Sequence, residues 1–153
     1  MSAQAMELQL IDICDEHGEV LQPALLVQAE AVHRQLRTRI PQDYVPKLKR
    51  VFHAGARMTV ALKDGKLVAL AVWRHFEDTH DGFKFYVDDL VTDEAHRGQG
   101  IGSALIALLC DKAKAGGAAH LVLDVGVQRH ETQRFCFRER FSIISHSFKK
   151  PLS

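Results

Sequence analysis

The chain has 153 residues, of which 46% are hydrophobic and 25% are charged, a composition typical of a globular protein with a substantial core. Its 20 basic and 19 acidic residues leave a formal charge of +1, so no long-range field attracts nucleic acid or an anionic membrane surface. We therefore expect a single domain over residues 1–153 that binds neither nucleic acid nor membrane.

The cysteines and histidines form no pattern typical of a disulfide framework or a metal site. Cys14, Cys110 and Cys136 are odd in number and include no CxxC pair, which suits reduced thiols in the cytoplasm. No apolar run approaches the roughly 20 residues that cross a bilayer, and the N-terminus carries acidic residues where a signal peptide is basic. The nine histidines lack HxH or HExxH spacing. We expect a cytoplasmic protein without a metal site.

Hydrophobic periodicity separates strands, in which apolar residues alternate, from helices, in which they recur every three or four positions. The Asp64-Gly65 pair between two β-prone runs is typical of a tight hairpin. The predicted elements are a strand over 6–13, helices over 23–36 and 44–54, strands over 57–62, 66–76 and 83–91, a helix over 101–115, a strand over 120–125, a helix over 130–139 and a closing strand over 141–148.

The order of these elements indicates the fold class. Short turns between the strands of 57–91 favour an antiparallel meander, whereas the strand, helix and strand of 83–125 form a crossover that implies a parallel pair. We expect an α/β (α+β) fold with a mixed, mostly antiparallel sheet of about six to seven strands, a parallel splay at the crossover and about four flanking helices.

A polar connector with two cations, Arg37 and Arg39, joins the first two predicted helices. The favoured interpretation is that these are solvated charges at the end of a helix. The alternative is a loop that faces a substrate, since loops often carry recognition residues.

A strand, a glycine-rich turn and a helix follow one another between residues 87 and 109. Gly98, Gly100 and Gly102 leave the backbone uncovered where the helix begins, and free N–H groups at a helix start can hold an anion. No Lys-Ser or Lys-Thr follows, as a nucleotide P-loop requires, and the spacing is not the GxGxxG of a dinucleotide site. The turn predicts a different phosphate site; the alternative is that the glycines only shape a tight turn.

The run over 87–109 resembles the signature of the GNAT N-acetyltransferase superfamily, which is Arg or Gln, two residues, Gly, one residue, and Gly or Ala. Arg97, Gly100 and Gly102 occupy those positions. The acidic pair before Leu-Val, in Asp88-Asp89-Leu90-Val91, is similar to many members. The resemblance implies a GNAT fold over the whole chain and acetyl-CoA as the co-substrate.

The resemblance also implies where acetyl-CoA binds. The pyrophosphate would lie on the N–H groups from Gln99 to Ser103 near Arg97, and the pantetheine would pair with Leu90 and Val91, where two strands splay. The implied cofactor-binding residues are Leu90, Val91, Arg97, Gly98, Gln99, Gly100, Ile101, Gly102 and Ser103.

Acetyl transfer to an amine requires a neutral nucleophile. Because an alkylamine has a pKa near ~10.4, a carboxylate acting directly or through water is a suitable base. Asp88 and Asp89 are the candidates, and consecutive residues on a strand should point to opposite faces, so that one reaches the substrate. The alternative is that both are structural. The backbone N–H of Val91 or its neighbour is the natural donor to the oxyanion.

The acid that protonates the leaving thiolate departs from the family pattern. Phe135 and Phe141 match the last helix of the family, but Cys136 stands where tyrosine is common, Arg140 where glycine is common and Arg129 where asparagine is usual. Candidate acids are the Cys136 thiol, with an ordinary pKa near ~8.5, the Tyr86 hydroxyl on the predicted strand over 83–91, or water. Cys136 as a small packed residue is equally compatible with the sequence.

We therefore expect an enzyme that moves the acetyl group of acetyl-CoA directly to a primary amine, on a small molecule. The alternatives are a CoA-binding module with little catalysis, and a protein acetyltransferase acting on lysine or an N-terminus. Arg37, Arg39, Tyr44 and Lys47, in the first two helices and their loop, favour an anionic group on the amine. Members of the family are often homodimers.

Overall fold

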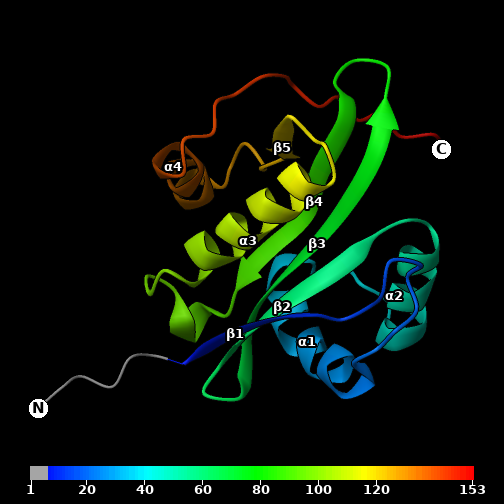
Figure 1. Cartoon of the computed structure of the whole chain (residues 1–153), viewed down its shortest axis with the longest axis vertical. Helices are drawn as coiled ribbons and strands as arrows, with labels where there is room; N and C mark the ends of the chain where they lie inside the picture. Colours follow the sequence, from blue (N-terminus) through cyan, green and yellow to red (C-terminus); the bar gives the residue numbers. More distant parts are fainter. Residues whose placement is uncertain (1–6) are drawn as a thin grey trace, which may run out of the picture. The chain divides into compact units, whose positions relative to one another are not determined.

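Five strands form one sheet whose spatial order, β1-β2-β3-β4-β5, follows their order along the chain. The computed structural model describes residues 7–153, and the meander of β2, β3 and β4 lies at its centre (Figure 1). The first four strands pair antiparallel, whereas β5 is parallel to β4. The bounds are β1 Leu8–Asp12, β2 Arg57–Lys63, β3 Lys66–Asp78, β4 Gly82–Thr92 and β5 His120–Leu123.

The hairpin between β2 and β3 is the one that the sequence predicts. Asp64 and Gly65 both adopt positive φ, of 50° and 82°, between the paired residues Lys63 and Lys66. Two consecutive residues of positive φ form the turn whose twist matches that of antiparallel strands, and Asp-Gly adopts it readily.

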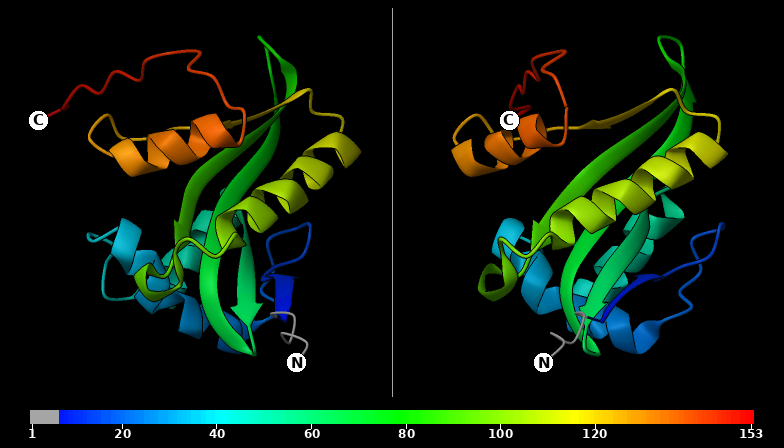
Figure 2. Two further views of the ribbon diagram at one scale, coloured as in Figure 1. Left: turned by 90° about the vertical axis from the view of Figure 1, so that its left-hand side faces the viewer. Right: turned by 60° about the vertical axis from the view of Figure 1, so that its left-hand side comes forward.

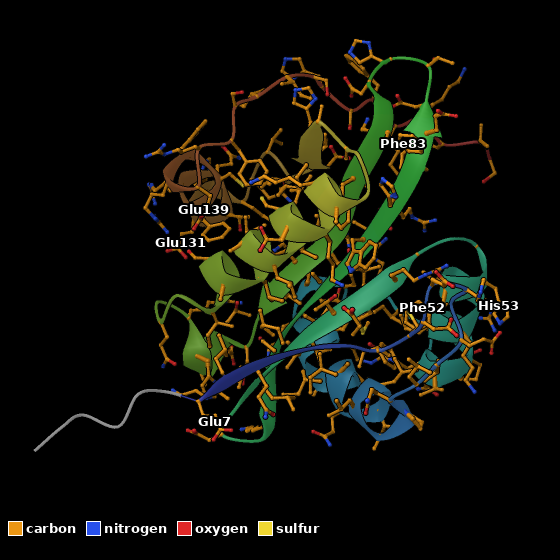
Figure 3. The ribbon with its side chains drawn as sticks, viewed as in Figure 1. Glu7, Phe52, His53, Phe83, Glu131 and Glu139 are labelled. Atoms are coloured by element: carbon orange, nitrogen blue, oxygen red, sulfur yellow. The ribbon has the colours of Figure 1, made fainter. Side chains whose placement is uncertain are left out.

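Helices cover both faces of this sheet. On one face lie α1 Pro23–Leu36 and α2 Tyr44–His53, with a core that includes Leu26, Phe52 and Leu70. Phe52 points from α2 towards the sheet, while His53 points outwards (Figure 3). The opposite face is covered by α3 Ile101–Ala115, which lies across β3 and β4 (Figure 2). None of the helices among residues 7–153 is long and apolar enough to cross a membrane.

The chain divides into two compact units, the first ending at Val122 and the second beginning at Leu123. The second unit contains α4 His130–Arg138 and an extended segment over 139–153. The expectation of a single domain over 1–153 stays a prediction.

The predicted sheet of six to seven strands is wrong in number, because residues 141–148 form no strand. This run is rich in β-prone residues, yet Ile143, Ile144 and Phe148 are 72%, 71% and 96% exposed. β-propensity measures how well a side chain fits a half-buried sheet surface. A β-prone segment therefore forms no strand when it has no neighbouring strand to pair with. The predicted first strand begins at Met6, which lies outside the described residues.

Candidate functional site

The glycine-rich turn leaves an open, uncovered backbone at the start of α3. Gly98 and Gly100 have φ of 75° and 80°, and a Cβ built on either would meet no atom within 4 Å. Ile101 begins the helix, and its first turn contains no acidic residue. The first N–H groups of a helix have no acceptor within it, and the positive end of the dipole is unneutralised here. The turn is therefore suited to an anionic ligand.

Two cations border this turn. The Arg97 Nε donates to the carbonyl oxygen of Thr92 at 3.3 Å, and the Lys63 Nζ donates to Oε1 of Gln99 at 2.8 Å. Lys63 ends β2, 36 positions before Gln99. Sequence reasoning did not connect the two, because only the strand order brings the end of β2 to the start of α3.

Packing on both faces holds the part of β4 that precedes the turn. Leu90 packs with the cluster that contains Ile101 and Leu105 of α3, whereas Val91 is 7% exposed in the core beneath α1 and α2. The backbone at these two positions is fixed from both sides.

A β-bulge interrupts β4 at Asp88, two residues before Leu90. Val72 of β3 is opposite Asp89, but the next residue, Trp73, is opposite Val87, so Asp88 is an extra residue with no partner across the pair. A bulge bends the strand and changes the direction of the side chains around it.

The expectation that the two aspartates point to opposite faces is wrong, because Asp88 is the extra residue of the bulge. The Asp88 Oδ2 accepts a hydrogen bond from Arg74 Nε at 2.7 Å, and Arg74 Nη1 donates to the carbonyl oxygen of Ala54 at the end of α2. Asp89 contacts His33 of α1 at 2.8 Å. Both carboxylates thus lie on the face covered by α1 and α2, because the extra residue cancels the strand alternation.

Asp89 is the centre of a hydrogen-bonded network with α1. Its Oδ2 lies 2.8 Å from Nε2 of His33, whose Nδ1 lies 2.9 Å from the hydroxyl of Tyr44. Its Oδ1 accepts from Arg37 Nε at 2.6 Å, and Arg37 Nη2 also donates to the carbonyl oxygen of Asp88 at 2.9 Å. Since an ionised carboxylate only accepts, Nε2 of His33 carries the proton of the bond to Asp89.

The surroundings favour the ionised form of Asp89. Burial of this carboxyl favours its neutral form, but the hydrogen bonds and positive charge of His33 and Arg37 outweigh the burial and hold its pKa below the ordinary value. Burial raises the pKa of the Tyr44 hydroxyl, so Tyr44 stays neutral in the network.

The two aspartates differ in access to solvent. The Asp88 side chain is 26% exposed and has one ion pair, with Arg74, whereas the Asp89 side chain is 12% exposed and is held by both His33 and Arg37. Asp88 is therefore the carboxylate that an incoming molecule can reach more easily.

A second contact ties α1 to the segment between β4 and the glycine turn. The Gln35 side chain donates to Oδ1 of Asp93 at 3.0 Å and accepts from the backbone N–H of Glu94 at 3.0 Å. Sequence reasoning missed His33 and Gln35, and it gave Arg37 as a solvated charge or a contact to an anionic acceptor, not as a partner of Asp89. The spacing of His33 and Arg37, four residues apart on one helix face, is a signal that could have found the pair.

Tyr86, a candidate acid, lies on β4 directly opposite Arg74 of β3. The Lys84 Nζ is 5.8 Å from the centroid of its ring. Because directly opposite residues share a face, Tyr86 lies on the same face of the sheet as Arg74.

Cys136, the other candidate acid, belongs to the second unit. It is 8% exposed in α4, and burial, followed by the charge of Glu139, raises the pKa of its thiol. Arg140, which stands where the family commonly has glycine, has a φ of 67°. This left-handed conformation favours glycine, which accounts for the usual residue at that position.

Sequence comparison finds relatives that are acetyltransferases. A family model described as "Acetyltransferase (GNAT) family" matches residues 25–140. The chain is 29% identical over 121 residues to an uncharacterized N-acetyltransferase, YhdJ, of Bacillus subtilis, a match covering 77% of this chain and 85% of the relative. It is 30% identical over 94 residues to an aminoalkylphosphonate N-acetyltransferase of Salmonella typhimurium, covering 61% of each chain.

Solved structures share the fold. An aminoglycoside N-acetyltransferase, AAC(6')-Iy, in complex with CoA superposes with a TM-score of 0.82 at 14% identity, with 100% of both chains covered. An acetyltransferase of Trypanosoma brucei gives a TM-score of 0.74 at 22% identity, covering 95% of this chain and 100% of the other. Because the family model matches most of the chain and the fold agrees, this chain belongs to the GNAT acetyltransferase family.

Proposed function

We propose that the chain transfers the acetyl group of acetyl-CoA directly to a primary amine of a small molecule. Membership of the family makes the chain an acetyl-CoA-dependent N-acetyltransferase. Our proposal concerns two further points: that the acetyl group passes directly to the amine, and that the amine belongs to a small molecule. The observation that carries it is a bulge bearing a reachable carboxylate, Asp88, on the strand that leads into an anion-binding glycine turn. One continuous segment of the chain, from the bulge to the glycine turn, would then supply both the proton acceptor and the binding site for acetyl-CoA.

The residues of the turn fit the diphosphate of acetyl-CoA. The N–H groups from Gln99 to Ser103 would hold it, with Arg97 as a nearby cation, because the open space at Gly98 and Gly100 lets a ligand approach the backbone. Leu90 and Val91 would bind the pantetheine amides through their backbone groups. The bound co-substrate supplies an activated acetyl group on a thiol that leaves easily.

We assign proton removal from the amine to Asp88, acting directly or through water. Asp88 is more exposed than Asp89 and has a single ion pair, so it can reach an incoming ammonium. Asp89, ionised and bound on both oxygens, would act as a positioning residue that holds the bulge. A backbone N–H at Val91 or its neighbour would stabilise the developing negative charge on the acetyl oxygen.

Protonation of the leaving thiolate is assigned to Cys136, with Tyr86 and water as alternatives. The raised pKa keeps the Cys136 thiol protonated at neutral pH, as a proton donor must be. We expect Cys136→Ala to lower kcat and to move the alkaline limb of the pH–rate profile, with Tyr86→Phe close to the parent. Matching profiles for both variants and the parent would exclude both side chains.

Substitution of Gly100 tests the diphosphate site. A valine there is strained at a φ of 80° and covers the N–H groups, so Gly100→Val should weaken CoA binding by about tenfold or more, measured by calorimetry. The control is Gly82→Val in the β3–β4 hairpin, where φ is 79° and the surrounding space is equally open. Equal CoA affinity in the two variants would contradict the assignment.

Replacement of Asp88 tests the base. Asp88→Asn keeps the shape but cannot accept a proton, so kcat should fall about 10²- to 10⁴-fold while CoA affinity is retained. A kcat within twofold of the parent would show that Asp88 is not the base.

Replacement of Asp89 should instead alter stability and its pH dependence. Because the folded pKa of Asp89 is lowered, its ion pairs stabilise the protein above about pH 4, near the ordinary pKa, and this contribution is lost as the pH falls towards the lowered value. Urea unfolding should show Asp89→Asn to be less stable at pH 7, with a smaller difference from the parent at pH 3. A difference that grows on acidification would contradict this role.

A further inference from the structure

The segment from the end of α1 into α2 is more strongly positive than the chain as a whole. Residues 37–50 contain five basic residues and one acidic residue, Asp43, whereas the whole chain has a formal charge of only +1. The basic residues are Arg37, Arg39, Lys47, Lys49 and Arg50. This concentration is local, so it concerns what binds beside these helices rather than the chain as a whole.

Ion pairs neutralise only part of this charge. Arg37 is paired with Asp89, and Arg50 lies 3.5 Å from Asp43. The side chains of Arg39, Lys47 and Lys49 make no hydrogen bond or ion pair with any residue of the described range 7–153. Three cations on this segment are therefore available to a ligand.

Lys47 lies on the same edge of α2 as Ala54, whose carbonyl oxygen binds the partner of the candidate base. Val51 and Ala54 follow it at spacings of four and seven residues, which places the three on one edge of the helix. The carbonyl oxygen of Ala54 accepts from Arg74, and Arg74 pairs with Asp88. Lys47 is also half-buried, whereas Lys49 is exposed and points about 160° away around the helix.

The bulge offers no spare negative charge to a cationic acceptor. Asp88 and Asp89 are matched by Arg74 and Arg37, and His33 also contacts Asp89, so this cluster has no net negative charge. Lys47 and Arg39 then leave the surroundings positive. A polycationic amine would be repelled there, whereas an amine with an anionic group would be attracted. Positive surroundings also lower the pKa of the bound ammonium, which favours the neutral nucleophile.

We infer that the acceptor is a short amine that carries an oxyanion group, such as a phosphonate, and that Lys47 with Arg39 binds this group. The inference rests on the proposed function and names the substrate class of the same site. The relative from Salmonella typhimurium, named an aminoalkylphosphonate N-acetyltransferase, is consistent with this class.

The test compares two-carbon amines that differ only in their second group. Thiol release from acetyl-CoA should be fastest, as kcat/KM, with 2-aminoethylphosphonate, slower with ethanolamine and slowest with ethylenediamine. Lys47→Gln should raise KM for 2-aminoethylphosphonate about tenfold with little change in kcat, and leave ethanolamine unaffected. Lys47→Arg should restore part of the loss, and Lys49→Gln serves as the matched control.

Calorimetric binding of 2-aminoethylphosphonate to the CoA complex separates the two proposals. Transfer without preference for the anionic amine, or an equal effect of Lys47→Gln on all three amines, overturns the inference and leaves the transferase proposal standing. Binding that depends on Lys47 with no transfer to any amine supports the inference and overturns the transfer step. Absence of both binding and transfer overturns both.

Discussion

The hydrogen bonds of Asp89 with His33 and Arg37 are the constraint on which the site depends. They join α1 to β4 across 56 and 52 positions of sequence, and Arg37 also binds the carbonyl oxygen of Asp88. A largely buried carboxylate is tolerated only while it is paired and hydrogen-bonded, so loss of either partner weakens the compensation of its charge. The bulge at Asp88 is thereby held in one conformation, with Asp88 itself left partly exposed.

In this arrangement, proton transfer and co-substrate binding are assigned to two different parts of the chain, the bulge in β4 and the turn that follows β4. The bulge, clamped by α1 and by Arg74, would handle the proton of the amine, and the glycine turn ten residues later along the chain would hold the diphosphate. Gln35 connects the two parts through Asp93 and Glu94, so the same helix positions both. The excess cations on the segment after α1 are the groups proposed to bind an anionic group of the acceptor.

Features that depend on local sequence could be predicted, and features that depend on pairing could not. The helices and the Asp64-Gly65 hairpin follow from periodicity and turn chemistry, and the glycine turn before α3 follows from three nearby residues. The bulge exists only in the pairing of β3 with β4, so strand alternation alone misplaced Asp88 relative to Asp89. The prediction of a closing strand over 141–148 is wrong for a similar reason, because β-prone residues form a strand only beside a neighbouring strand.

Amide hydrogen exchange with and without CoA tests the central claim, that the start of α3 is the diphosphate site. The first N–H groups of a helix exchange quickly because they have no acceptor within the helix. Saturating CoA should slow exchange from Gly100 to Ser103 and leave the β3–β4 hairpin unchanged. Binding of CoA with unchanged exchange over 100–103, or with protection confined to other segments, would contradict the account.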